Sequence, residues 1–188
     1  MLLENRFTRS LLMAATIVID AMGNDHGVEP IVHAVASLSL QRRINMILVG
    51  DANAITESLM KIAHDPSFIQ IQHADSFVSM AEKPVIALQE KTNASINVAC
   101  ELIASGRGDA LVSAGNTGAI ILSASKNFQR IARVKKAGLA AVYPTQQTHG
   151  PKKDPFALIL DVGATLHVRS YDLVVFALMG SVYAQIIS

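Results

Sequence analysis

Short, nearly continuous apolar runs alternate along the chain with longer stretches of helical periodicity. Apolar runs of four to eight residues bounded by glycine or polar residues are typical of strands buried on both faces. On this basis the sequence predicts six strands, at 16–20, 45–50, 68–73, 109–113, 139–143 and 156–161. The intervening periodicity predicts helices at 28–39, 54–63, 85–105 with a break near Asn93, 117–128 and 171–187.

The alternation of strands and helices predicts the fold class. It favours an α/β protein with three α/β/α layers around a mostly parallel sheet. Right-handed crossovers would then bring the loops that follow the strands to one edge of that sheet. The polar segment 145–154 is interpreted as a surface loop before the last strand.

Two apolar segments imitate targeting or membrane signals. Residues 11–19 follow Arg6 and Arg9 but run at once into Asp20, so 16–20 is interpreted as a buried strand. Residues 1–13 are then a flexible extension, and 14–188 form one domain. The run 173–187 is shorter than a membrane-spanning helix and is interpreted as a buried helix.

Composition narrows the classes of function. Of 188 residues, 51% are hydrophobic and 16% are charged, which indicates a folded chain. A net charge of +1 gives no reason to expect nucleic acid as a partner. The single cysteine, Cys100, lies in an apolar helical stretch, is interpreted as a buried small hydrophobe, and favours a reducing, cytoplasmic location.

Three glycine-bearing turns follow predicted strands, and they carry most of the candidate chemistry. They are DAMGND at 20–25, SAGNTGA at 113–119 and DVGAT at 161–165. Ligands of open parallel sheets bind outside the carboxyl ends of the strands, so these turns are expected to share one pocket.

The turn at 113–119 is the most informative of the three. Gly115 and Gly118 let the backbone approach a ligand closely, and Asn116 is a good N-cap for a helix that begins near Thr117. Free amides at such a helix start suit an anion such as phosphate. An ordinary strand–turn–helix with tightly packed glycines is an equally weighted interpretation. The motif matches neither nucleotide fingerprint, so no cofactor is expected.

Other polar residues give weaker signals. Asp20, Asp25 and His26 suggest a metal or acid–base cluster, but no second group of ligands completes it, so no metal is expected. Asp161 holds the position equivalent to Asp20 and carries the same ambiguity. The basic stretch after the helix at 117–128 is either a solvated helix end or a dock for an acidic protein. Its members are Lys126, Arg130, Arg133, Lys135 and Lys136.

Several motifs occur together in the order found in one known family. The chain resembles the bacterial phosphate acyltransferases, which transfer an acyl group from acyl-carrier protein to inorganic phosphate for phospholipid synthesis. The matching segments are 20–27, 48–51, 79–99, 113–119, 161–164 and 176–184. The resemblance covers about residue 16 to the end and corresponds to the N-terminal half of the family.

Several positions depart from the family pattern. The family has a second glycine and then a proline near Asn24 and Val28, and an arginine–proline pair near Lys136 and Ala137. It also differs at 91–95 and 165–167, and it continues well past residue 188 with further motifs.

The resemblance implies a fold like that of isocitrate and isopropylmalate dehydrogenases. It also implies a homodimer, acyl-carrier protein as donor, inorganic phosphate as acceptor, and delivery of acyl-phosphate to a membrane glycerol-3-phosphate acyltransferase. The implied location is cytoplasmic, with peripheral association at the inner face of the membrane as a further expectation.

The mechanism expected from these residues needs no covalent nucleophile. Phosphate carries the attacking oxygen itself, so orientation and charge stabilisation are sufficient. Asp20, Asn116 and Asp161 are the candidate catalytic residues, with both aspartates orienting turns rather than touching phosphate. The phosphate site is expected to comprise Gly23, Ser113, Gly115, Asn116, Thr117, Gly118 and Gly163. Arg130, Arg133, Lys135 and Lys136 are the candidate contacts to the carrier protein.

Three alternatives remain open. The first is a phosphotransacylase that uses acyl-coenzyme A. The second is a catalytically incomplete fragment or binding remnant, for which uncovered apolar surface and poor solubility are expected. The third is a dehydrogenase of the same fold, which is disfavoured because the nucleotide fingerprint is missing.

Overall fold

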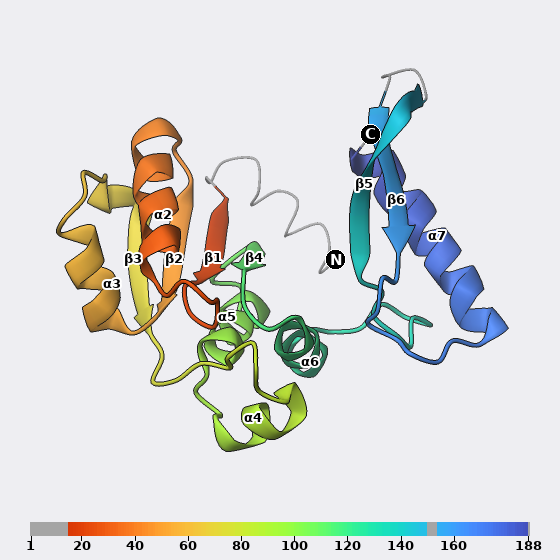
Figure 1. The fold of residues 1–188 in the computed structure, drawn as a ribbon, viewed down its shortest axis with the longest axis horizontal. Helices are drawn as coiled ribbons and strands as arrows, with labels where there is room; N and C mark the ends of the chain where they lie inside the picture. The colour runs from red at the N-terminus through yellow and green to blue at the C-terminus, as the bar shows by residue number, and fades with distance from the viewer. Residues whose placement is uncertain (1–14, 150–153, 188) are drawn as a thin grey trace. The chain divides into compact units, whose positions relative to one another are not determined.

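The computed structural model describes residues 15–149 and 154–187. The expected extension at 1–13 lies outside these residues. The chain divides into two compact units, 1–128 and 129–188 (Figure 1).

The first unit contains a four-stranded parallel sheet in the order β3-β2-β1-β4. Its strands are β1 (Thr16–Asp20), β2 (Asn45–Gly50), β3 (Ile69–His73) and β4 (Ala110–Ser113). Adjacent strands are in close register, since Asp20 pairs with Val49 on one side and Ser113 on the other. The ends of β1 and β4 are therefore direct neighbours, which places two of the glycine-bearing turns side by side.

Helices cover both faces of this sheet. They are α2 (Glu29–Gln41), α3 (Ala52–Leu59), α4 (Pro84–Glu90), α5 (Ser95–Ala104) and α6 (Thr117–Asn127), with a short 3-10 helix η1 (Pro66–Phe68) before β3. Ile19 and Leu48 pack with residues of α2 and α3. Val18 and Ile47, one position away on the same strands, pack with residues of α5. This alternation produces the three α/β/α layers that the sequence predicts.

Local signals explain where the helices begin and end. Asp51 caps α3 by accepting hydrogen bonds from the amides of Asn53 and Ala54 at 2.9 and 3.3 Å. The long helical stretch at 85–105 is broken between Glu90 and Ser95, which confirms the predicted interruption near Asn93. This break lets α5 pack against the sheet while α4 packs with α5 and α6 in a separate apolar cluster.

The second unit consists of β5 (Ala140–His149), β6 (Asp154–Leu160) and α7 (Ser170–Ile187). β5 and β6 pair with each other in antiparallel fashion and form a separate two-stranded sheet. The expectation that these strands would join the parallel order is wrong, because no helix lies between them to reverse the chain direction. The polar segment expected to be a loop is also largely strand, and β5 tolerates Pro144 because both strands of a two-stranded sheet are edges.

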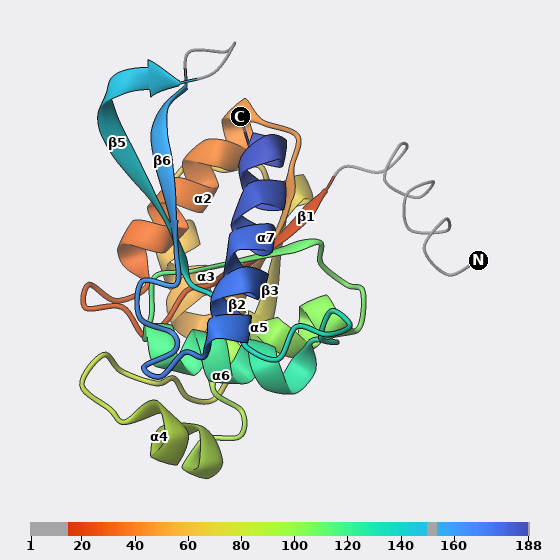
Figure 2. The same ribbon diagram turned by 90° about the vertical axis from the view of Figure 1, so that its right-hand side faces the viewer.

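α7 packs against β6, which lies between β5 and α7 in both views (Figure 1 and Figure 2). Phe176 is buried, and a Cβ added at Gly180 would lie 3.9 Å from the Leu160 side chain. Asp172, Phe176 and Gly180 are four residues apart, so they share one side of the helix. None of the helices in the described ranges has the length and apolar content needed to cross a membrane.

The remaining surface of α7 is strongly apolar and uncovered. Val174, Leu178, Val182 and Ile186 recur every fourth residue, and their exposed fractions are 59%, 64%, 58% and 76%. We name these four residues the α7 stripe. Continuous exposed apolar surface of this kind favours self-association.

The α7 stripe predicts that the purified chain associates in solution. Replacing Leu178 and Val182 together with Gln should shift the chain toward monomer, because the two changes remove apolar area without lowering helix propensity much. Size-exclusion chromatography with light scattering measures this directly. Met60→Gln, at an exposed apolar residue in the first unit, is the control and should leave association unchanged. A wild-type chain that is monodisperse and monomeric at high concentration contradicts the prediction.

Candidate functional site

Two of the three predicted glycine turns meet at the carboxyl edge of the parallel sheet. Gly23 is buried with a φ of +80°, and a Cβ added there would lie 2.8 Å from the carbonyl oxygen of Val78. The same Cβ would lie 3.7 Å from the Cα of Gly115 in the second turn. Only glycine satisfies both the left-handed backbone and the close approach. The structure therefore brings the turns at 20–25 and 113–119 together, as the sequence predicts.

A buried carboxylate joins the two turns. Asp20 is 3% exposed, and its Oδ2 accepts a hydrogen bond of 2.8 Å from the Ser113 hydroxyl. Its Oδ1 accepts one of 3.2 Å from the Met22 amide. The Ser113 hydroxyl in turn accepts from the Gly115 amide at 3.1 Å. The chain of contacts from Asp20 through Ser113 to Gly115 fixes the backbone just before α6.

Burial and hydrogen bonding act on Asp20 in opposite directions. Loss of solvent raises the pKa of its carboxyl group, while hydrogen bonds from Ser95, Ser113 and the Met22 amide lower it. Burial has the larger effect, so the pKa is raised overall. A cavity of about 10 Å³ beside Asp20, lined also by Ser95 and Asn116, is at the lower limit of the space that holds a single water. Asp20 is thus a buried support behind the turn and not a solvent-facing acid.

Asn116 begins α6 and uses its whole side chain in doing so. Its Oδ1 accepts from the Ala119 amide at 3.1 Å, which confirms the predicted N-cap. Its Nδ2 donates to the carbonyl oxygens of Ser79 and Glu82 at 3.1 and 3.2 Å. The side chain therefore ties the loop at Ser79 and Glu82 to the start of α6. The Asn116 Nδ2 group, expected from the sequence to donate to phosphate, already donates to these two carbonyl oxygens.

The fastened loop is held by a second set of contacts. The Lys91 ammonium lies 2.6 and 2.8 Å from the two carboxylate oxygens of Glu82, and it also donates to the Phe77 carbonyl at 3.0 Å. Glu82 accepts from the Ser79 amide at 2.8 Å as well. The Lys91 hydrogen bond and the Ser79 amide lower the pKa of Glu82 to about 2, so Glu82 is ionised at neutral pH. Sequence reasoning missed this pair, because only the fold makes the two residues neighbours.

The groups at the start of α6 define what the site can do. Thr117 and Gly118 are the first two helical residues, so their amides have no acceptor within the helix. Thr117 is exposed, and a Cβ added at Gly118 would lie 2.7 Å from the Pro84 ring. The helix start is therefore open at Thr117 and closely covered at Gly118. Such an arrangement can bind and orient an anion but supplies no acid or base of its own.

The third glycine turn belongs to the second unit. Asp161 has a φ of +68°, and its Oδ1 accepts from the Ala164 amide at 2.9 Å, while Gly163 has a φ of +130°. Asp161 therefore stabilises its own turn. β6 is antiparallel to β5, so the rule for the carboxyl ends of parallel strands does not by itself place this turn beside the other two. The contribution of Asp161 and Gly163 to a shared pocket stays a prediction.

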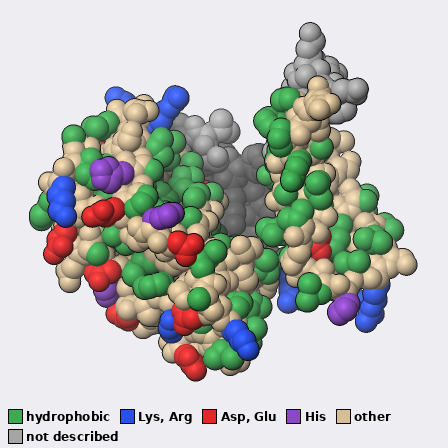
Figure 3. Space-filling view, viewed as in Figure 1, with side chains coloured by type: hydrophobic (Ala, Val, Ile, Leu, Met, Phe, Trp, Pro, Cys, Tyr) green, Lys and Arg blue, Asp and Glu red, His purple; other side chains and the backbone are tan. Residues whose placement is uncertain are grey.

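The predicted partner-binding cations are not equivalent. Arg130, Arg133 and Lys135 are exposed. Lys136 instead forms an ion pair of 3.1 Å with Asp172 and donates to the His167 carbonyl at 2.5 Å. Its ammonium group therefore holds the segment at His167 and the start of α7 together. On the face drawn in Figure 3, the cations of the first unit are interspersed with carboxylates and form no continuous basic surface.

Other candidate groups have structural explanations. Cys100 is buried, and desolvation is the main reason that its pKa rises to about 11, which confirms the interpretation as a small hydrophobe. Asp25 and His26 are exposed in a turn that Asn24 organises by accepting from the His26 amide at 2.8 Å. Among the described residues no group of three or more His, Cys, Asp or Glu is arranged to hold a metal ion.

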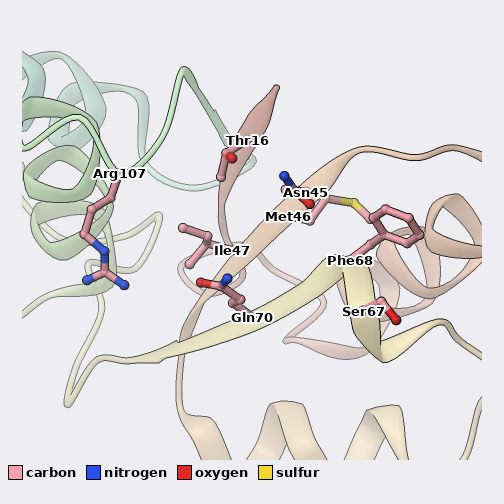
Figure 4. Close-up of a pocket in the computed structure, with 8 residues that line it drawn as sticks. All are labelled: Thr16, Asn45, Met46, Ile47, Ser67, Phe68, Gln70 and Arg107. Atoms are coloured by element: carbon pink, nitrogen blue, oxygen red, sulfur yellow. The ribbon is translucent and has the colours of Figure 1, made fainter. Parts of the chain in front are cut away.

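A separate cavity of about 200 Å³ opens at the amino ends of the parallel strands (Figure 4). Thr16 and Asn45, the first residues of β1 and β2, line it together with Gln70 and Arg107. It therefore lies at the opposite edge of the sheet from the glycine turns. The Arg107 side chain also donates to Gln72 at 3.3 Å. This cavity is not part of the candidate phosphate site.

The fold and the strand-end site define an α/β protein in which two glycine-bearing turns meet at the carboxyl edge of a parallel sheet. A family model described as "Fatty acid synthesis protein" matches residues 15–188, and the chain belongs to this family.

Named relatives agree with this assignment. A protein named phosphate acyltransferase from Gloeothece citriformis is 36% identical over 171 residues, covering 91% of this chain and 47% of the relative. Proteins of the same name from Oleidesulfovibrio alaskensis and Tolumonas auensis are 38% and 37% identical over 169 and 173 residues. Those alignments cover 90% of this chain and 47% and 49% of the relatives. The chain thus spans about half the length of the curated relatives it matches.

The contact between the two turns predicts a large cost for adding one methyl group. Gly23→Ala combines a left-handed backbone, worth about 1–2 kcal/mol, with a steric clash worth about 1–3 kcal/mol more. Gly27→Ala is the matched control, because Gly27 has a φ of +73° but no atom within 4 Å of an added Cβ. Urea unfolding of both variants separates the two costs. Equal destabilisation of the two variants contradicts the close approach at Gly23.

The raised pKa of Asp20 predicts a pH-dependent difference between wild type and Asp20→Asn. An acid whose pKa is higher in the folded state stabilises the protein while protonated, and this stabilisation is lost as pH rises from 3.8 through the raised value. The free energy of unfolding of Asp20→Asn should therefore increase relative to wild type over that interval. Urea unfolding at a series of pH values tests this, and a constant difference would contradict it.

Proposed function

We propose that the start of α6 binds inorganic phosphate and orients it for attack on an acyl thioester. The acyl group is transferred from acyl-carrier protein to phosphate, giving acyl-phosphate for phospholipid synthesis. The observation that carries this proposal is the fixed helix start. Hydrogen bonds of Asp20, Ser113 and Asn116 hold its backbone, while Thr117 at the first helical position is exposed.

The mechanism follows from what these groups supply. A phosphate oxygen attacks the thioester carbonyl carbon, the carbon–sulfur bond breaks, and the thiol leaves with a proton. The Thr117 and Gly118 amides place partial positive charge against the phosphate without reorganising during the reaction. Asp20 is too deeply buried to touch phosphate, and it acts by positioning Ser113 and the Gly115 backbone. Because Gly23 and Gly115 carry no side chain, the two turns can pack closely against each other.

The remaining parts of the proposal concern the whole protein. The names of the relatives support acyl transfer to phosphate, and the domain that begins near residue 14 would form the first part of the active enzyme. Asp161 and Gly163 would complete the phosphate site, and Arg130, Arg133 and Lys135 would contact the acidic carrier protein. We further propose a homodimer of dehydrogenase-like fold in the cytoplasm, with peripheral association at the membrane that holds the glycerol-3-phosphate acyltransferase.

A second candidate function is phosphate binding without catalysis. It is favoured by the lack of an available acid or base among the described residues of the site, since Asp20 is buried and the Asn116 side chain is already hydrogen-bonded. Assaying acyl-phosphate formation with acyl-carrier protein and acyl-coenzyme A thioesters separates the three outcomes. Turnover with the carrier thioester supports the proposal, turnover only with the coenzyme A thioester contradicts the proposed donor, and phosphate binding without turnover supports the second candidate.

Two substitutions at one position test the phosphate seat. Thr117→Pro removes the amide donor, yet proline is well tolerated at the first helical position after an extended residue, and Asn116 has φ −61° and ψ 112°. Phosphate affinity should fall about tenfold to a hundredfold, the value of a hydrogen bond to a charged group. Isothermal titration calorimetry with inorganic phosphate measures the change.

Thr117→Ala is the matched control, because it removes the hydroxyl and keeps the amide. It should bind phosphate with affinity closer to wild type than Thr117→Pro does. Equal affinity of wild type and Thr117→Pro contradicts the seat. In a full-length relative, the substitution equivalent to Asn116→Ala should raise the phosphate KM, since it releases the loop at Ser79 and Glu82.

A further inference from the structure

The second unit contains a cavity that the proposed function does not use. Its volume is about 330 Å³, and it is lined by Lys135, Lys136, Arg169, Tyr171 and Asp172. Sites for small organic ligands begin at roughly 300 Å³, so the cavity is large enough for a small molecule. The cavity at the amino ends of the strands, at about 200 Å³, is below this range.

One of the lining cations has a structural partner. Lys136 lies 3.1 Å from Asp172 and 2.5 Å from the His167 carbonyl oxygen. Asp172 also accepts from the Arg169 amide at 3.0 Å, which closes the first turn of α7. The Arg169 amide and Lys136 hold the pKa of Asp172 below its usual value, so this carboxylate stays ionised and neutralises Lys136. Lys136 and Asp172 therefore line the cavity as an ion pair without adding net charge.

The other two cations are available to a ligand. Lys135 and Arg169 are exposed, and neither forms an ion pair with any residue in the described part of the chain. Three cations and one carboxylate line the cavity, which leaves two positive charges uncompensated. Lys135 and Arg169 are 34 positions apart in the sequence, so only the fold reveals that they share a cavity. Two nearby cations match the charge of a phosphate ester or a carboxylate.

The wall of the cavity adds a second requirement. Most of its exposed surface is carbon rather than nitrogen or oxygen. Tyr171 is held in place because its hydroxyl donates to the Arg133 carbonyl at 3.3 Å, which leaves its ring as an apolar surface. An inorganic anion would use the charges but not this wall. A molecule with an anionic head and an apolar body would use both.

We propose that this cavity is a binding site for an amphipathic organic anion, whose phosphate or carboxylate head is held by Lys135 and Arg169 beside the Tyr171 ring. The site is separate from the seat on α6, since every residue that lines it belongs to the second unit. Ligand binding at this cavity can therefore be confirmed or disproved independently of the proposed phosphate site. Of this pair of cations, Lys135 belongs to the basic stretch noted in the sequence, and Arg169 lies outside that stretch.

Calorimetry on the full chain tests the site with octyl phosphate as the probe, below its critical micelle concentration. Octanoate and inorganic phosphate are titrated in parallel. Octyl phosphate should bind more tightly than inorganic phosphate, because only the former covers the apolar wall. Arg169→Gln and Lys135→Gln should each weaken octyl phosphate binding by about tenfold or more, which is the loss of one charged hydrogen bond. Comparison with octanoate shows whether the head is a phosphate or a carboxylate.

Three controls make the result decisive. Lys126→Gln removes an exposed lysine of the first unit and should leave octyl phosphate binding unchanged. Thr117→Pro should weaken inorganic phosphate but not octyl phosphate, which separates this site from the α6 seat. Leu178→Gln alters the α7 stripe and should have no effect on the probe. The proposal is overturned if Leu178→Gln weakens the probe as much as Arg169→Gln does, or if neither cation variant changes its affinity.

Discussion

The hydrogen bond from Ser113 to Asp20 is the contact on which the candidate site depends. It joins the ends of two neighbouring parallel strands, and it does so with a carboxylate that burial makes unfavourable to ionise. The same hydroxyl accepts the Gly115 amide, so one side chain connects β1, β4 and the turn into α6. This connection fixes the backbone that leads into α6. With it, the first amides of α6 are held in place before any ligand arrives.

The surrounding residues reinforce this fixed edge from the other side. Asn116 ties the loop at Ser79 and Glu82 to the helix start, and the ion pair between Glu82 and Lys91 holds that loop in turn. The polar side chains at the site are thus engaged with one another. In the proposed function, the groups left to meet phosphate are backbone amides at the start of α6. On this proposal Asn116 and Ser113 position the backbone and do not contact the anion directly.

Much of the fold follows from local sequence signals. The bounds of β1 and β2 and the interruption before Ser95 agree with the periodicity, because buried parallel strands and a polar break leave clear patterns. The direction of β6 does not follow, since alternation of strands and helices says nothing where no helix intervenes. The tether from Asn116 spans 37 and 34 residues to its two acceptors, and no local pattern records it. Likewise, no local pattern predicts that Arg169 and Lys135 line the same cavity, because only the packing of the second unit brings them together.

The most direct test of the account is a phosphate titration followed by ¹H–¹⁵N NMR on the full chain. The amide resonances of Thr117 and Gly118 should show the largest shifts and saturate together, because these two amides are the proposed donors to the anion. In Asp20→Asn the same shifts should require more phosphate, since Ser113 loses the carboxylate that holds it. Saturable shifts centred on other amides, with Thr117 and Gly118 unmoved, would contradict the central claim.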